Sequence, residues 1–139
     1  MQKCRKLIAN RLMSAALGVV EPTEVGIGVM HCIWGLYMVN PVILSQLPEF
    51  WDIYPRYFNP CVFGVLSLAI SSFTWVAFLK MGINIRRVAM MLSFVFWLYL
   101  VAGFIASGFI YPSVTFFVYF MLTSGWAFIR LSLRKKVKV

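Results

Sequence analysis

Residues 88–106 have the sequence VAMMLSFVFWLYLVAGFIA and form a long apolar run. It contains no charged side chain, and at a rise of about 1.5 Å per residue it would form a helix about 28 Å long. That length matches the hydrocarbon core of a bilayer. The run is continuously apolar rather than alternating, which argues against a β-barrel strand. The stretch therefore predicts a membrane-spanning helix.

Three similar apolar runs occur elsewhere in the chain, at about residues 25–44, 60–79 and 113–129. Together the four runs predict an all-α integral membrane protein with four transmembrane helices in a bundle. The composition agrees, because 62% of the 139 residues are hydrophobic and 12% are charged. Soluble globular domains have about 45–50% apolar and about 25% charged residues. A soluble enzyme or binding domain is not expected, and the apolar content excludes disorder.

Residues with strong preferences for helix ends lie between these runs. Asn59 followed by Pro60 is typical of a helix N-cap and first helical position. Gly82 can end the second helix and Asn84 can cap the third. Pro41 would lose a backbone hydrogen bond inside a helix, so the first helix should end or kink just before it.

The basic residues lie almost entirely on one side of this predicted topology. The chain has 13 Lys and Arg against 4 Asp and Glu, a formal net charge of +9. The residues placed on the basic side are Lys3, Arg5, Lys6, Arg11, Lys80, Arg86, Arg87, Arg130, Arg134, Lys135, Lys136 and Lys138. The opposite side has Arg56, accompanied by Glu49 and Asp52. The positive-inside rule therefore places both termini in the cytoplasm. Since topology explains these charges, nucleic acid is not expected as a partner.

Basic segments flank the predicted four-span domain, residues 21–131. Residues 1–20 predict an amphipathic helix lying on the inner leaflet, and residues 132–139 form a polybasic cytoplasmic tail. Lysine and arginine near a membrane surface attract anionic lipids. The side chains expected to contact such lipids are Lys3, Lys6, Arg134, Lys135, Lys136 and Lys138.

The outer segment, residues 41–60, is rich in proline and aromatic residues. Aromatic rings favour the membrane interface, so a simple aromatic belt is the plainer interpretation. The alternative is a docking surface for a partner protein. Trp51, Tyr54 and Tyr57 are the candidate contacts for such a partner.

His31, the single histidine, falls inside the first predicted span and is the candidate intramembrane polar site. An ionisable residue at that depth suggests a proton relay or a cavity lining. It can equally hydrogen-bond a neighbouring helix and serve packing, and no acidic residue lies in a span core to complete a relay.

Small residues spaced along the spans predict close helix packing, either within the chain or between copies in a homo-oligomer. The candidates are Gly28, Gly35, Ser67, Ser71, Ala102, Gly103, Ala106 and Ser107.

Recognisable catalytic, cofactor and metal motifs do not occur in the sequence. There is no CxxC, HExxH, Walker A or GxSxG pattern, so neither an enzyme nor a cofactor is expected. Cys4, Cys32 and Cys61 are far apart in sequence, and packing roles are favoured for all three.

One part of the chain resembles a known group of proteins. Pro22-Thr23-Glu24, followed by Trp34-Gly35-Leu36-Tyr37 and Asn40-Pro41, resembles small multi-span membrane proteins encoded by tailed bacteriophages. The likeness covers roughly residues 22–60. It implies a phage origin and hence a bacterial inner membrane as the location. The small size, the basic cytoplasmic ends, the packing motifs and the lack of a catalytic motif then favour a non-enzymatic protein that self-associates and acts on the host envelope, by holin-like permeabilisation or by exclusion of other phages. A small oligomeric transporter or flippase, and a structural subunit of a larger complex or virion, are the alternatives.

Overall fold

All secondary structure in the described part of the chain is α-helical. The computed structural model describes residues 22–45, 59–80, 82–106 and 112–136. Its helices are α2 (Pro22–Val39), α3 (Pro41–Ser45), α5 (Pro60–Lys80), α6 (Ile83–Ala106) and α7 (Pro112–Lys136). The predicted all-α class is confirmed for these residues. Several predictions lie outside them: the helix at 1–20, the outer-segment contacts and the lipid contacts at Lys3, Lys6 and Lys138.

Three of the helices are long and apolar enough to cross a membrane. Their candidate spans are Pro60–Leu79, Ile83–Ala106 and Val114–Leu133. The 18 residues of α2 would extend about 27 Å, but they include the polar side chains of Glu24 and His31. Three helices therefore support an integral membrane protein, and α2 is not among the candidate spans of the described residues.

The helix starts follow the local chemistry of the chain. The Asn59 side-chain oxygen accepts hydrogen bonds from the backbone N–H groups of Cys61 (3.0 Å) and Val62 (3.4 Å), which confirms the predicted N-cap. The predicted cap at Asn84 is wrong, because α6 already begins at Ile83. The Gly82 carbonyl accepts the first backbone hydrogen bonds of α6 instead.

A break at Asn40 divides the first apolar run. Helix α2 ends at Val39, and the short helix α3 starts at Pro41. The Asn40 side-chain oxygen caps α3 by accepting the Val42 backbone N–H at 3.0 Å. The run predicted over 25–44 is thus two helices, because proline cannot continue the hydrogen bonding of the first.

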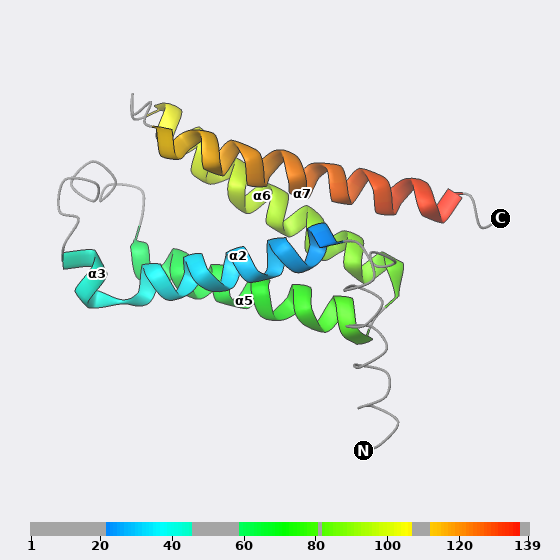
Figure 1. Ribbon diagram of the computed structural model, residues 1–139, viewed down its shortest axis with the longest axis horizontal. Coiled ribbons are helices and arrows are strands. Elements are labelled where there is room, and N and C mark those ends of the chain that lie inside the picture. Colours follow the sequence, from blue (N-terminus) through cyan, green and yellow to red (C-terminus); the bar gives the residue numbers. More distant parts are fainter. Residues whose placement is uncertain (1–21, 46–58, 81, 107–111, 137–139) are drawn as a thin grey trace, which may run out of the picture.

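The long helices pack as two pairs that cross each other (Figure 1). Helix α2 lies along α5, and α6 lies along α7. The start of α2 and the end of α7 lie at the same end of the bundle. Helix α7 continues to Lys136, beyond the predicted span end at 129, so that the first residues of the basic tail are helical.

Glycines allow α2 and α5 to approach closely. A Cβ added at Gly35 would lie 2.6 Å from Leu68 Cγ and 2.9 Å from the Gly64 carbonyl oxygen. A Cβ added at Gly64 would in turn lie 2.9 Å from Met38 Cβ. Only glycine fits such a contact between backbones.

The apolar core has two parts, one toward each end of the bundle. The first is an aromatic cluster formed by Met38, Ile70, Phe96, Trp97, Leu100, Val101, Phe104, Val114, Phe117 and Phe120. The second is nearer the start of α2 and contains Ile27, Ala77, Ala89, Met90, Ala127 and Leu131. Between them lies a layer of buried polar side chains.

Candidate functional site: the His31 network

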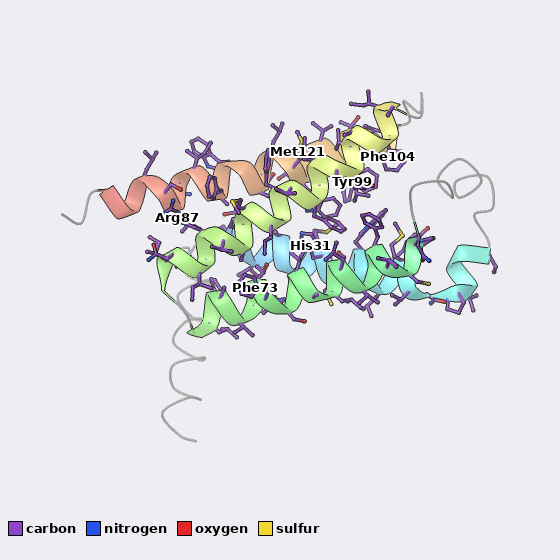
Figure 2. The ribbon with its side chains drawn as sticks, turned by 180° about the vertical axis from the view of Figure 1, so that it is seen from behind. His31, Phe73, Arg87, Tyr99, Phe104 and Met121 are labelled. Carbon is purple, nitrogen blue, oxygen red and sulfur yellow. The ribbon has the colours of Figure 1, made fainter. Side chains whose placement is uncertain are left out.

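Four polar side chains meet at the centre of the bundle, one from each long helix. They are His31 of α2, Ser67 of α5, Ser93 of α6 and Ser124 of α7, and each is 0% exposed. Each lies close to the midpoint of its own helix. Figure 2 shows His31 where α2, α5 and α6 come together. We call these four residues the network. It lies near the middle of the four long helices.

Both ring nitrogens of His31 are hydrogen-bonded. Nδ1 lies 3.0 Å from Ser67 Oγ, and Nε2 lies 2.8 Å from Ser93 Oγ. The Ser67 hydroxyl donates to the His31 backbone carbonyl at 2.9 Å. A neutral imidazole donates from one ring nitrogen and accepts at the other, so it can be hydrogen-bonded to both serines at once.

The hydrogen bonding extends to α7 through Ser124. Its Oγ lies 3.0 Å from Ser93 Oγ and 2.7 Å from the Phe120 carbonyl oxygen, and its single hydrogen is donated to one of these two oxygens. Ser71, one turn after Ser67, donates to the Gly28 carbonyl at 2.7 Å. The network thus joins four helices and satisfies buried groups that would be costly to leave unpaired in lipid.

Aromatic rings enclose the imidazole on the α6 side. The centroids of the Phe96 and Trp97 rings each lie 5.0 Å from that of His31. Trp97 is itself 0% exposed. Among the described residues, the imidazole is contacted by serine hydroxyls and aromatic rings and by no charged side chain. Its evident capacity is to hold the helices in a fixed arrangement.

A buried ion pair joins α2 to α6 near one end of the bundle. Arg86 Nε donates to Glu24 Oε2 at 2.8 Å, and the Arg86 terminal nitrogen Nη2 pairs with Glu24 Oε1. The side chains are 1% (Glu24) and 12% (Arg86) exposed. A two-point pairing of this kind fixes orientation as well as charge. Glu24 is therefore engaged, and is not a free carboxylate for proton coupling.

Replacing Glu24 with glutamine should destabilise the protein by about 1–2 kcal/mol. The substitution leaves the Arg86 charge uncompensated, and a nearby aqueous interface limits the penalty. Unfolding by SDS titration from mixed micelles measures it. The double variant E24Q/R86Q should recover part of the loss, since no unpaired charge then remains. Wild-type stability of E24Q would show that the pair contributes nothing.

The predicted packing residues divide into two groups. Gly28, Gly35, Ser67 and Ser71 lie at the contact between α2 and α5. Ala102 and Ala106 are exposed on α6, and Gly103 is half-buried. Ser107 lies outside the described residues, as do the side chains of Arg134, Lys135 and Lys136.

Several residues of the site were not singled out from the sequence. Ser93 and Ser124 are single serines within apolar runs, and Gly64 and the Glu24–Arg86 pairing also require knowledge of which helices are neighbours. One signal was available. Ser93 and Ser124 lie near the middle of their runs, at the depth expected for His31, and polar groups at equal depth tend to pair in a bilayer.

An apolar groove of about 490 Å³ lies between α5 and α6. It is lined by Phe63, Leu66, Ala69, Ile70, Phe73, Leu92, Val95, Phe96 and Tyr99. Figure 2 shows Phe73 and Tyr99 on these two helices. The lining offers no set of convergent polar groups of the kind that positions a reacting substrate.

Within the four described ranges, no group of three or more His, Cys, Asp and Glu residues could hold a metal ion. Cys32 and Cys61 are free thiols. No family model, curated protein or solved structure matches the chain.

Proposed function

We propose that this chain is a non-enzymatic integral membrane protein that acts by self-associating in the bilayer. In this proposal α2 is the fourth span and both termini are cytoplasmic. The basic residues on one side of the topology support that orientation. So does the position of the start of α2 and the end of α7 at one end of the bundle.

The observation that carries the proposal is the exposed small-residue face of α6. Ala102 and Ala106 lie one turn apart, and both are exposed. Small residues at that spacing allow a second helix to approach closely, with packing and weak interhelical contacts as the driving force in lipid. Gly35 and Gly64 are already used inside the chain, whereas this alanine face is available to a second copy.

The closed interior supports action by an assembly rather than by a single chain. The central polar groups of the network are occupied by one another, and aromatic rings of α6 cover one side of His31. Any water path would therefore form between copies. This favours permeabilisation by an oligomer over transport through one bundle, and the engaged Glu24 also weighs against a proton-coupled transporter.

The biological setting of the proposal is a bacteriophage protein acting on the host inner membrane. Holin-like permeabilisation and exclusion of competing phages are its two forms, and the resemblance over residues 22–60 supports this setting. The structural-subunit alternative would rely on Trp51, Tyr54 and Tyr57, which lie outside the described residues.

Cysteine cross-linking in membranes tests self-association. With the native cysteines replaced by serine, A102C should form disulfide-linked dimers on oxidation, whereas V65C, at an exposed position of α5, should not. Adding A106L should reduce the amount of A102C dimer about fivefold. The larger side chain keeps the two helices apart and weakens their association by about 1 kcal/mol. A102C that stays monomeric at every expression level would contradict the proposal.

Controlled expression in a bacterium tests the consequence for the envelope. We expect an abrupt loss of membrane potential at a defined time after induction, followed by growth arrest. A106L should delay that loss. An intact potential with normal growth would rule out permeabilisation and leave phage exclusion, which challenge of the expressing cells by unrelated phages would measure.

A further inference from the structure

The apolar groove between α5 and α6 arises from the way these two helices are connected. Helix α5 ends at Lys80 and α6 begins at Ile83, so a two-residue link holds their adjoining ends together. Away from that link the two helices separate, since α5 lies along α2 and α6 lies along α7 (Figure 2). A wedge-shaped space of about 490 Å³ therefore remains between them.

The groove opens toward the outside of the bundle. Ile70 and Phe96 form its floor, since they are only 7% and 4% exposed. Leu66 and Val95 form its rims, since they are 46% and 53% exposed. Both helices are candidate membrane spans, so the open side of the groove faces lipid.

The groove lies within the hydrocarbon core of the bilayer. Its lining residues are all within six positions of Ser67 on α5 or of Ser93 on α6. These serines belong to the network, which lies near the middle of the long helices. Six positions correspond to about 9 Å along a helix, whereas the hydrocarbon core extends about 15 Å to each side of its midplane. Lipid headgroups therefore lie beyond the groove, and hydrocarbon chains surround it.

The lining favours a hydrocarbon chain over a polar ligand or a protein. Eight of the nine lining side chains have no polar atom, and Tyr99 is the ninth. A polar ligand would lose its hydrogen bonds in such surroundings. The nine lining residues are also few beside the roughly 20–30 that each partner contributes to a stable protein interface.

The gain on filling the groove comes from packing contacts. A chain that enters it from the bilayer exchanges one apolar environment for another, so the hydrophobic effect contributes little. In the groove, however, the chain contacts carbon atoms of both helices, whereas on a convex helix face it contacts protein on one side only. About ten additional carbon contacts would favour the groove about fivefold.

We propose that the groove binds one acyl chain of a membrane phospholipid and holds it longer than the chains around the rest of the bundle. The chain enters at the wide end of the wedge. Phe63 of α5 and Tyr99 of α6 line that end, stacked with their ring centroids 5.4 Å apart. The headgroup of the same lipid stays at the membrane surface. The site does not depend on self-association.

Photo-crosslinking from an acyl chain tests the site. The full chain is reconstituted at one copy per nanodisc in phosphatidylcholine that contains a small fraction of phosphatidylcholine with a diazirine in the middle of one chain. Illumination forms adducts, which peptide mass spectrometry locates. Leu92 lines the groove and is 41% exposed, whereas Leu122 of α7 lies outside it and is 60% exposed. Both leucines lie within two positions of a network serine, so they have the same reactivity at nearly the same depth.

Exposure alone would give more adducts on Leu122, and the groove gives the opposite result. We expect about fivefold more adducts on Leu92 than on Leu122. Equal labelling of the two, or more on Leu122, would overturn the proposal.

Two variants and a second reconstitution identify the occupant. A69F fills the groove from an exposed position of α5 and should reduce the Leu92 adducts to the level of Leu122. V65F, on the same helix but outside the lining, should leave the excess unchanged. An excess that persists in A69F would contradict the site. Discs with two copies should also keep the excess, as should A106L. Loss of the excess with two copies would show that a second copy covers the groove and would overturn the assignment to lipid.

Discussion

Replacing His31 with alanine is expected to destabilise the protein by about 2–3 kcal/mol. The variant loses two interhelical hydrogen bonds, each contributing about 0.6 kcal/mol in a membrane protein. Removal of the ring also leaves a cavity beside Phe96 and Trp97, which adds about 1–2 kcal/mol. SDS titration of the protein in mixed micelles, followed by circular dichroism, measures the change in the free energy of unfolding.

Ser72→Ala is the matched control for His31→Ala. Ser72 is exposed and donates only to the Leu68 carbonyl of its own helix, at 2.9 Å. Its replacement should change the unfolding free energy by less than about 0.5 kcal/mol. In a double-mutant cycle, H31A and S93A should be coupled, since each removes the same hydrogen bond. Additive effects would show that this bond does not stabilise the fold. Wild-type stability of H31A together with loss of activity would instead indicate a functional histidine.

Replacing Gly35 with leucine is expected to have the largest effect on stability, about 3 kcal/mol. The first added atom would meet Leu68 and the Gly64 carbonyl, and the backbone carbonyl cannot rotate away. The α2–α5 pair must then separate. That separation also weakens the hydrogen bonds that Ser67 and Ser71 donate to α2. The same SDS titration measures the loss, and disulfide trapping of G35L with cysteines across α2 and α5 would detect the increased spacing.

Gly26→Leu provides the corresponding control within α2. Nothing lies within 4 Å of a Cβ placed at Gly26. The substitution should therefore be neutral or slightly stabilising, because leucine favours the helix more than glycine does. If G26L and G35L lost equal stability, the effect would reflect side-chain size in α2 and not the contact with α5.

The helices could be predicted because hydropathy and helix-end chemistry are local properties. The cap at Asn59 and the helix break before Pro41 could each be predicted from neighbouring residues alone. The start of α6 could not be predicted from local properties. The predicted span began at 88, because it excluded the adjacent arginines. Arg86 is accommodated in the helix because Glu24, 62 positions earlier, neutralises it. That compensation can be seen only once α2 and α6 are known to be neighbours.

The hydrogen-bond partners of His31 could not be predicted either, because they also depend on which helices are neighbours. The sequence indicates a polar group in the first span, but serine is common in membrane helices and small-residue spacing occurs on every span. Gly35 and Ala106 belong to similar patterns, yet one is used inside the chain and the other is exposed. Deciding between these outcomes requires the rotation of each helix about its axis, and sequence spacing does not determine that rotation.

Because the His31 network occupies a single layer, it fixes the vertical register of the four helices. A slide of α2 by a single turn, about 5.4 Å, would carry His31 away from both Ser67 and Ser93, and a slide of α5 or α6 would break one of the two contacts. Membrane proteins meet a thinner or thicker bilayer by tilting, by bending or by moving helices past one another. In this protein, sliding of the helices past one another would break the hydrogen bonds of His31. A change in bilayer thickness should therefore tilt the bundle as one body and leave its interior intact.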